Sequence, residues 1–187
     1  SFYAVSCNSS NPAPTFTNGK SEALSKTNKC MEKYDINKVY TQYKEFIASY
    51  IDLKALASKI IEQRQLSPVM NDTKWLELQT AILSIPEFEP AYNIQLLTDN
   101  ITYSPIFEQV PTYLGSWEFI YENYEYSLPP FFKIEWIAIQ PLYAVRRGRL
   151  VEPEIIDKSS MLLDILHKFH IPFEKADEHT FVIYGYK

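Results

Sequence analysis

The chain has 187 residues, of which 46% are hydrophobic and 22% are charged, and its formal net charge is -5. These values are typical of a globular domain and exclude a wholly disordered chain. No apolar run reaches the roughly 18 residues of a membrane-spanning helix. The net negative charge argues against nucleic-acid binding, which needs a basic face.

Residues 1–34 predict a flexible leader, and residues 35–187 predict a single α+β domain. The leader is rich in Ser, Asn, Thr and Pro, which is typical of a tether. It contains both cysteines of the chain, Cys7 and Cys30. Two cysteines in a loose arm favour a disulfide and an exported or periplasmic location. The alternatives are two free thiols in a cytoplasmic protein and, less favoured, a lipid anchor at Cys7.

Two helices are predicted in the first half of the domain. Apolar residues recur at spacings of three and four over residues 35–65, and neither Pro nor Gly interrupts them before Pro68. This spacing predicts one long amphipathic helix with Asp35 as its N-cap. A shorter helix is predicted over residues 73–84, capped by Asp72.

Strands dominate the predictions that follow. Residues 91–98 predict a strand, and residues 131–140 predict a central strand because both of their faces become apolar. Residues 142–147 predict a further strand, residues 159–169 a helix, and residues 173–184 a terminal hairpin. This order predicts an α+β fold with a mainly antiparallel sheet of about four to six strands. Two N-terminal helices and one later helix are expected to pack on that sheet.

The middle of the chain is acidic and aromatic. Residues 67–133 carry nine acidic and two basic side chains. Residues 108–125 mix carboxylates with aromatic rings, a combination that suits a surface for another protein. The alternative is a long loop whose rings fill the edge of the core. The candidate partner-binding residues are Glu108, Trp117, Glu118, Tyr121, Glu122, Tyr124 and Glu125.

A polar cluster is predicted over residues 134–157, where three arginines surround Gly148. Guanidinium groups suit bidentate binding of a phosphate or carboxylate, and nearby carboxylates suit acid–base catalysis. Internal ion pairing is the alternative reading of such a cluster. Its members are Glu135, Arg146, Arg147, Arg149, Glu154 and Asp157.

Other chemical signatures are weak. His167 and His170 have a spacing that two ligands of one metal can use, but no third ligand stands in a known pattern beside them. The glycine patterns of nucleotide-binding loops and the nucleophile motifs of hydrolases do not occur in the sequence. We therefore expect neither a metal nor a cofactor.

Four segments together resemble a family of small bacterial proteins known only as a domain of unknown function. These are NDTKWLEL (71–78), IEWI (134–137), RGRLVEPEIID (147–157) and VIYGY (182–186). The resemblance covers roughly residues 55–187, departs from the family in the cysteine-bearing leader, and implies no established activity. The polar and aromatic residues that it marks are Asn71, Asp72, Lys74, Trp75, Glu135, Trp136, Arg147, Arg149, Glu154 and Asp157.

These observations predict a non-enzymatic protein-binding domain. An immunity-type inhibitor of a bacterial toxin or secreted effector is its expected form, by analogy with other small acidic bacterial proteins. The expected partner is another protein. The alternative is a hydrolase or small-anion-binding domain that uses the carboxylate and arginine cluster.

Overall fold

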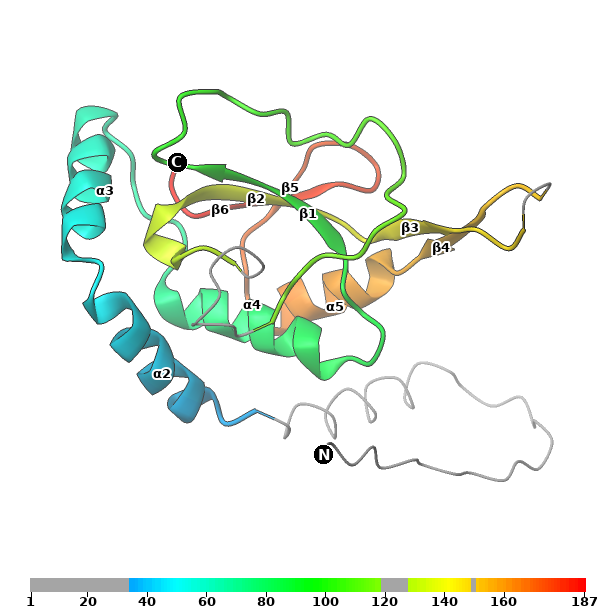
Figure 1. Cartoon of the computed structure of the whole chain (residues 1–187), viewed down its shortest axis with the longest axis horizontal. Coiled ribbons are helices and arrows are strands. Elements are labelled where there is room, and N and C mark those ends of the chain that lie inside the picture. Colours follow the sequence, from blue (N-terminus) through cyan, green and yellow to red (C-terminus); the bar gives the residue numbers. More distant parts are fainter. Residues whose placement is uncertain (1–33, 119–127, 149–150) are drawn as a thin grey trace.

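The computed structural model describes residues 34–118, 128–148 and 151–187 (Figure 1). Within them the fold is α+β, as predicted, with four α-helices, an antiparallel sheet in the order β1-β2-β6-β5, and a two-stranded sheet of β3 and β4. Cys7 and Cys30, with their predicted disulfide, lie outside the described residues. The elements are α2 (Ile36–Ala48), α3 (Ile51–Gln63), α4 (Asp72–Ser84), β1 (Ala91–Leu96), η3 (Phe131–Lys133), β2 (Ile134–Gln140), β3 (Leu142–Val145), β4 (Glu154–Asp157), α5 (Ser159–Lys168), β5 (Glu174–Lys175) and β6 (Phe181–Tyr184).

The long helix predicted over residues 35–65 is two helices, α2 and α3, so the prediction of two N-terminal helices was one too few. Asp35 caps α2 as predicted, because its side chain accepts a hydrogen bond from the N–H of Asn37 at 3.0 Å. The chain leaves helical geometry at Tyr50, with φ -93° and ψ 40°. The break turns α2 toward α4, where Val39 and Ile47 become buried.

Helices α4 and α5 cover one face of the four-stranded sheet (Figure 1). The N-cap of α4 is Asn71, one residue before the predicted cap, and its side chain accepts from the N–H of Lys74 at 2.9 Å. Trp75, Leu76 and Leu78 of this helix are buried. Burial on several sides of α4 explains why it forms the centre of the main core.

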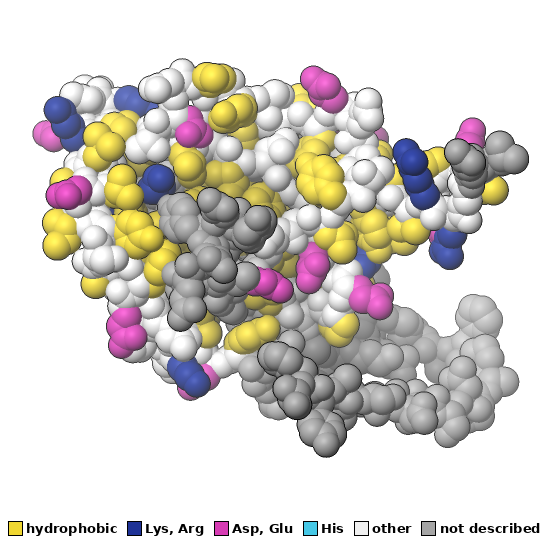
Figure 2. Space-filling model, in the orientation of Figure 1, with side chains coloured by type: hydrophobic (Ala, Val, Ile, Leu, Met, Phe, Trp, Pro, Cys, Tyr) yellow, Lys and Arg dark blue, Asp and Glu magenta, His cyan; other side chains and the backbone are white. Residues whose placement is uncertain are grey.

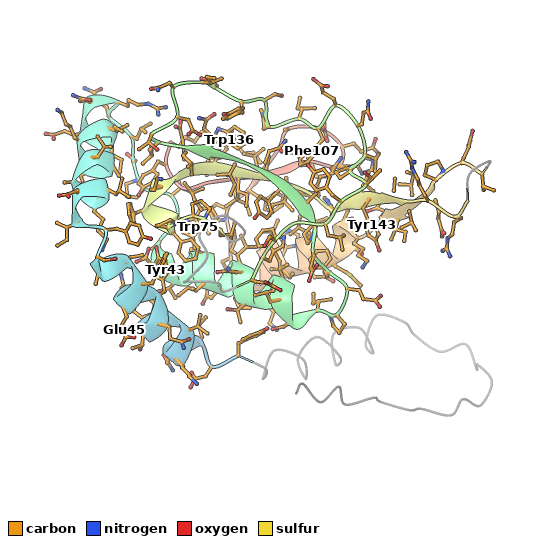
Figure 3. All side chains as sticks on the ribbon, in the orientation of Figure 1. Tyr43, Glu45, Trp75, Phe107, Trp136 and Tyr143 are labelled. Carbon is orange, nitrogen blue, oxygen red and sulfur yellow. The ribbon has the colours of Figure 1, made fainter. Side chains whose placement is uncertain are left out.

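Strand β2 is the central strand that the sequence predicts. It pairs with β1 on one side and with β6 on the other. Ile137 and Ile139 join the main core with α4 and α5, whereas Trp136 and Ala138 belong to a smaller cluster. Phe107, from the loop after β1, packs on that smaller cluster and so helps to cover the second face (Figure 3).

The strands β3 and β4 form a hairpin that projects from the domain (Figure 1). Strand β3 ends at Val145, two residues earlier than predicted. Strand β4 was not predicted, because its side chains are largely exposed and its sequence lacks a clear apolar alternation. The predicted terminal hairpin is confirmed by the pairing of β5 with β6. Among the helices described, none is long and apolar enough to cross a bilayer.

Candidate partner-binding site

The loop of residues 97–118 begins at a buried amide. Gln95, near the end of β1, is only 4% exposed. Its side-chain nitrogen donates to the carbonyl of Ile101 at 3.0 Å, and its side-chain oxygen accepts from the N–H of Tyr103 at 2.8 Å. The carboxylate of Asp99 also accepts from the N–H of Leu96 at 2.9 Å. Satisfied buried polar groups of this kind hold a loop in one conformation.

The far end of this loop is anchored in the core. Trp117 is 1% exposed, and its indole N–H donates to the carbonyl of Pro90 at 2.8 Å. The side chain of Gln79 in α4 donates to the carbonyl of Trp117 at 2.8 Å. A Cβ atom at Gly115 would overlap the carbonyl oxygen of Pro90, so this close approach requires glycine.

The middle of the loop is attached to the sheet and to the projecting hairpin. Phe107 packs against the small cluster of Trp136, Ala138 and Val182 on the sheet. The carbonyl of Pro111 accepts from the N–H of Ala144 in β3 at 2.8 Å. The loop is therefore held at both ends and at two points between them.

Apolar side chains nevertheless face solvent along this loop. Figure 2 shows hydrophobic side chains along the upper edge of the molecule, where Figure 1 places the loop. Five large apolar side chains of the loop have exposed fractions between 46% and 63%. We call the exposed side chains of residues 101–118 the loop surface. Its large apolar members are Ile101, Tyr103, Ile106, Tyr113 and Leu114.

The charge of the loop surface is negative. Glu108 and Glu118 of this loop are exposed. The sequence has neither Lys nor Arg over residues 75–132. The loop itself therefore supplies no cation to balance its carboxylates.

Tyr92 of β1 supports the same loop. Its hydroxyl donates to the carbonyl of Ser116 at 2.7 Å, and its ring meets the ring of Trp117 edge-to-face at 5.0 Å between centroids. Burial raises the pKa of Tyr92 to about 12, because the phenolate form would lose its hydration.

The free energy of unfolding should therefore fall in strong alkali. An unfolded tyrosine loses its proton near pH 10, so the contribution of Tyr92 is fully present below that pH. It is lost as the pH rises toward the folded pKa of about 12. Urea unfolding at about pH 9 and about pH 11 should show a loss of about 1 kcal/mol that Tyr92→Phe lacks. An equal loss in the variant would contradict this prediction.

The predicted acidic and aromatic tract is only partly described. Glu108 and Glu118 are exposed, as a partner surface requires. The prediction for Trp117 needs correction, because its ring lies in the core and is closed to a partner. For this residue the alternative of an aromatic ring that fills the core is what the structure shows. Tyr121, Glu122, Tyr124 and Glu125 lie outside the described residues.

The predicted polar cluster divides into separate sets. Glu135 in β2 binds Arg64, the C-cap of α3, through two hydrogen bonds of 2.6 and 2.7 Å. These hydrogen bonds from Arg64 to the carboxylate raise the pKa of Arg64, against a smaller opposing effect of burial. Glu135 is therefore bound to the N-terminal helices, whereas the hairpin arginines lie beyond the other end of β2 (Figure 1).

The remaining members lie in or beside the projecting hairpin. Arg147 pairs with Glu154 on the opposite strand. Asp157 accepts from the N–H of Ser159 at 2.8 Å, and hydrogen bonding from Ser159 lowers the pKa of Asp157. An open hollow at the tip is lined by Arg146, Arg147, Gly148, Val151 and Pro153. Arg149 lies outside the described residues.

Structural roles explain the segment NDTKW. Asn71 caps α4, and Asp72 pairs with Lys44 of α2 at 2.6 Å. The ammonium group of Lys74 donates to the carbonyls of Phe169 and His170, at the end of α5. A cation there satisfies free carbonyls and complements the helix dipole. Trp75, like Trp136 of the segment IEWI, is buried.

The family model that matches the chain describes a family of unknown function, DUF6678, and covers residues 57–187. The chain belongs to this family. The DUF6678 segment agrees closely with the resemblance predicted over residues 55–187. It contains the loop surface and the projecting hairpin, whereas α2 lies before it. No curated protein and no solved structure matches the chain.

Some important residues of the DUF6678 domain could not be found from sequence alone. Arg64 and Glu135 are far apart in the chain, and only the fold brings them together. Gln79 and Gln95 look like ordinary polar residues, although each is a buried amide that anchors the loop. Among the residues described, no group of three or more His, Cys, Asp or Glu side chains could hold a metal ion.

Proposed function

We propose that this chain is a non-enzymatic protein-binding domain whose partner docks on the loop surface. One observation supports the proposal above all others. A loop that Gln95 and Trp117 anchor in the domain interior presents five large apolar side chains to solvent. Such side chains gain free energy when a partner removes them from water.

The make-up of the loop surface suits protein recognition. Tyr103 and Tyr113 are about half exposed, and tyrosine offers a large contact area at a small cost in side-chain entropy. The anchored loop also limits the backbone entropy that binding would remove. These features favour Tyr103 and Tyr113 as energetic anchors, in the way that a few central aromatic residues dominate many interfaces.

Charge defines the kind of partner. The loop surface has two exposed carboxylates, Glu108 and Glu118, and residues 101–118 contain neither Lys nor Arg. A partner with a basic rim around an apolar centre would complement this surface and would be steered toward it. Association should then slow as salt is added, because salt screens charges at the rim.

The specific form of the proposal is an immunity-type inhibitor of a bacterial toxin or secreted effector. An acidic, apolar loop surface suits an inhibitor that covers a basic face of such a protein. Location outside the cytoplasm is part of this form. It rests on the two cysteines, Cys7 and Cys30, in the N-terminal segment.

The test is capture of the partner from the native host with the full, tagged chain. We expect one protein at a stoichiometric ratio, and its loss with the double variant Tyr103→Ala/Tyr113→Ala. The matched control is Ile51→Ala, which removes an apolar side chain that is 72% exposed on α3. Thermal unfolding should show that all three chains are folded, because exposed side chains contribute little to stability.

Two results would overturn the proposal. One is the absence of any stoichiometric partner, and the other is a partner that the double variant retains as well as the control does. The immunity form has its own test. The captured partner should stop bacterial growth when expressed alone, and co-expression of this chain should restore growth. A partner that does not stop growth would contradict the proposal of an immunity-type inhibitor. The more general proposal of a protein-binding domain would still stand.

A further inference from the structure

Helix α2 is an arm attached to the family domain. The matched segment begins at residue 57, inside α3, and α2 ends at Ala48. The surface on which α2 rests nevertheless belongs to the matched segment, because it is formed around α4 and η3. The domain therefore has a docking surface for a helix, and a preceding part of the same chain occupies it (Figure 1).

Helix α2 packs as an amphipathic helix, and we call the surface around α4 and η3 that it contacts the groove. Val39, Tyr43 and Ile47, spaced four residues apart, are its buried side chains. The ring of Tyr43 stacks on Phe131 at 4.5 Å between centroids, and its hydroxyl accepts from the N–H of Phe131 at 3.0 Å. Phe131 in turn stacks on Trp75 at 5.9 Å between centroids. Regular anchors of this kind define helix-in-groove recognition.

An ion pair also joins α2 to the start of α4. The ammonium group of Lys44 lies 2.6 Å from the carboxylate of Asp72 at the start of α4. The hydrogen bond to Asp72 raises the pKa of Lys44, with burial opposing it. This pair joins the arm to the matched segment and offers a charge that can be reversed on either side.

The hinge between α2 and α3 is confined to Ser49 and Tyr50. Ser49 keeps right-handed helical geometry, with φ -78° and ψ -10°, and only Tyr50 departs from it, with ψ 40°. A ψ of about -40° at Tyr50 is typical of an α-helix and would join the two helices. Residues 35–65 contain neither Pro nor Gly and have a continuous helical period. The local sequence therefore favours the straight form that the packing of α2 prevents.

We propose that α2 exchanges between two copies of the chain, so that the α2 of each copy occupies the groove of the other. Straightening at Tyr50 carries α2 away from its own α4 and leaves the groove open for the second copy. The contacts of Tyr43 and Lys44 are the same in both arrangements. The geometry of the hinge and the protein concentration then decide which arrangement forms. This exchange does not rest on the proposed partner of the loop surface.

The first test reverses the charges of the ion pair. Lys44→Glu and Asp72→Lys each place like charges at the contact, and a mixture of the two restores opposite charges only between copies. Native mass spectrometry of the mixed full chains should show a heterodimer that is several-fold more abundant than either homodimer. The control mixture pairs Asp72→Lys with Lys38→Glu, the same charge reversal at an exposed position of α2. This mixture should show no preference for the heterodimer.

The second test fixes the hinge. Ile51 is the first residue of α3 and is exposed. Proline is favoured at that position, but within a continuous helix it removes a hydrogen bond and clashes with the carbonyl four residues earlier. Light scattering of the wild-type chain should show a monomer that gives way to a dimer as concentration rises. Ile51→Pro should stay monomeric, and Ile51→Ala should dimerise like the wild type.

The exchange is overturned if the wild-type chain stays monomeric at all concentrations tested. It is also overturned if the dimer persists in Ile51→Pro, or if the charge-reversed mixture behaves like its control. Circular dichroism should show that Ile51→Pro retains its helices. If that variant fails to fold, the charge-reversed mixture decides the question alone, because its chains keep the natural hinge.

Discussion

Replacing Gly185 with alanine should lower the free energy of unfolding by about 3 kcal/mol or more. Gly185 follows β6 and lies against the start of β2. A Cβ atom there would overlap the carbonyl oxygen of Ile134 and lie 3.2 Å from its carbonyl carbon. Both atoms belong to the backbone of the central strand, so they cannot rotate aside. The N–H of Gly185 donates to the carbonyl of Glu135 at 2.8 Å, and its own carbonyl accepts from the N–H of Val69 at 2.9 Å.

Gly148 provides the matched control for this substitution. A Cβ atom at Gly148 would lie 3.8 Å from the nearest side-chain atom, in Val151, which is an ordinary contact. Gly148→Ala should therefore change stability by no more than about 0.5 kcal/mol. Urea unfolding of both variants beside the wild type measures the difference. Similar losses of stability in the two variants would contradict the prediction. They would show that overlap with the backbone of Ile134 is not what makes Gly185→Ala destabilising.

Two of the four segments that mark the family meet at this point of the fold. IEWI supplies Ile134 and Glu135 of β2, and VIYGY supplies Gly185. The bidentate pair of Glu135 with Arg64 and the cap that Asn71 forms on α4 belong to the same framework. Most of the marked residues that the structure describes thus have a structural explanation. The family pattern identifies the architecture, and evidence on function has to come from the surface.

Local patterns predicted the elements whose environment is simple. The apolar character of both faces of residues 131–140 predicted β2, and Asp35 predicted the start of α2. The break at Tyr50 has no local signal, since it arises from the packing of Tyr43 on Phe131 far along the chain. Strand β4 was missed for the opposite reason, because a projecting hairpin buries too little to impose an apolar alternation.

The site was predicted less well than the fold. Composition indicated an acidic and aromatic middle, but it could not separate Trp117 in the core from Tyr113 at the surface. That distinction depends on the carbonyl of Pro90, which accepts the indole hydrogen bond. The exposed apolar side chains before residue 108 lay outside the predicted tract. The predicted polar cluster does not converge, because Glu135 binds Arg64 instead. Arg64 is the C-cap of α3 and lies 71 residues before Glu135, so no local pattern connects the two.

Replacing Trp117 with alanine should lower the free energy of unfolding by about 3 to 5 kcal/mol. The substitution removes a ring that is 1% exposed, together with its hydrogen bond to Pro90 and its edge contact with Tyr92. Trp117→Phe keeps most of the ring and loses the hydrogen bond, which leaves the buried carbonyl of Pro90 without this donor. It should cost about 1 to 3 kcal/mol. Tyr113→Ala, at a side chain that is 54% exposed, should cost no more than about 0.5 kcal/mol.

Unfolding and partner binding should therefore respond in opposite ways to these substitutions. Tyr113→Ala should weaken binding of the captured partner while its urea midpoint stays near that of the wild type. Trp117→Phe should lower the midpoint and, in conditions where the chain remains folded, bind the partner normally. If Trp117→Phe instead abolished binding without a loss of stability, the indole would have to contact the partner directly. The partner would then bind the face of the loop that carries Trp117, and the loop surface as we define it would not be the binding site.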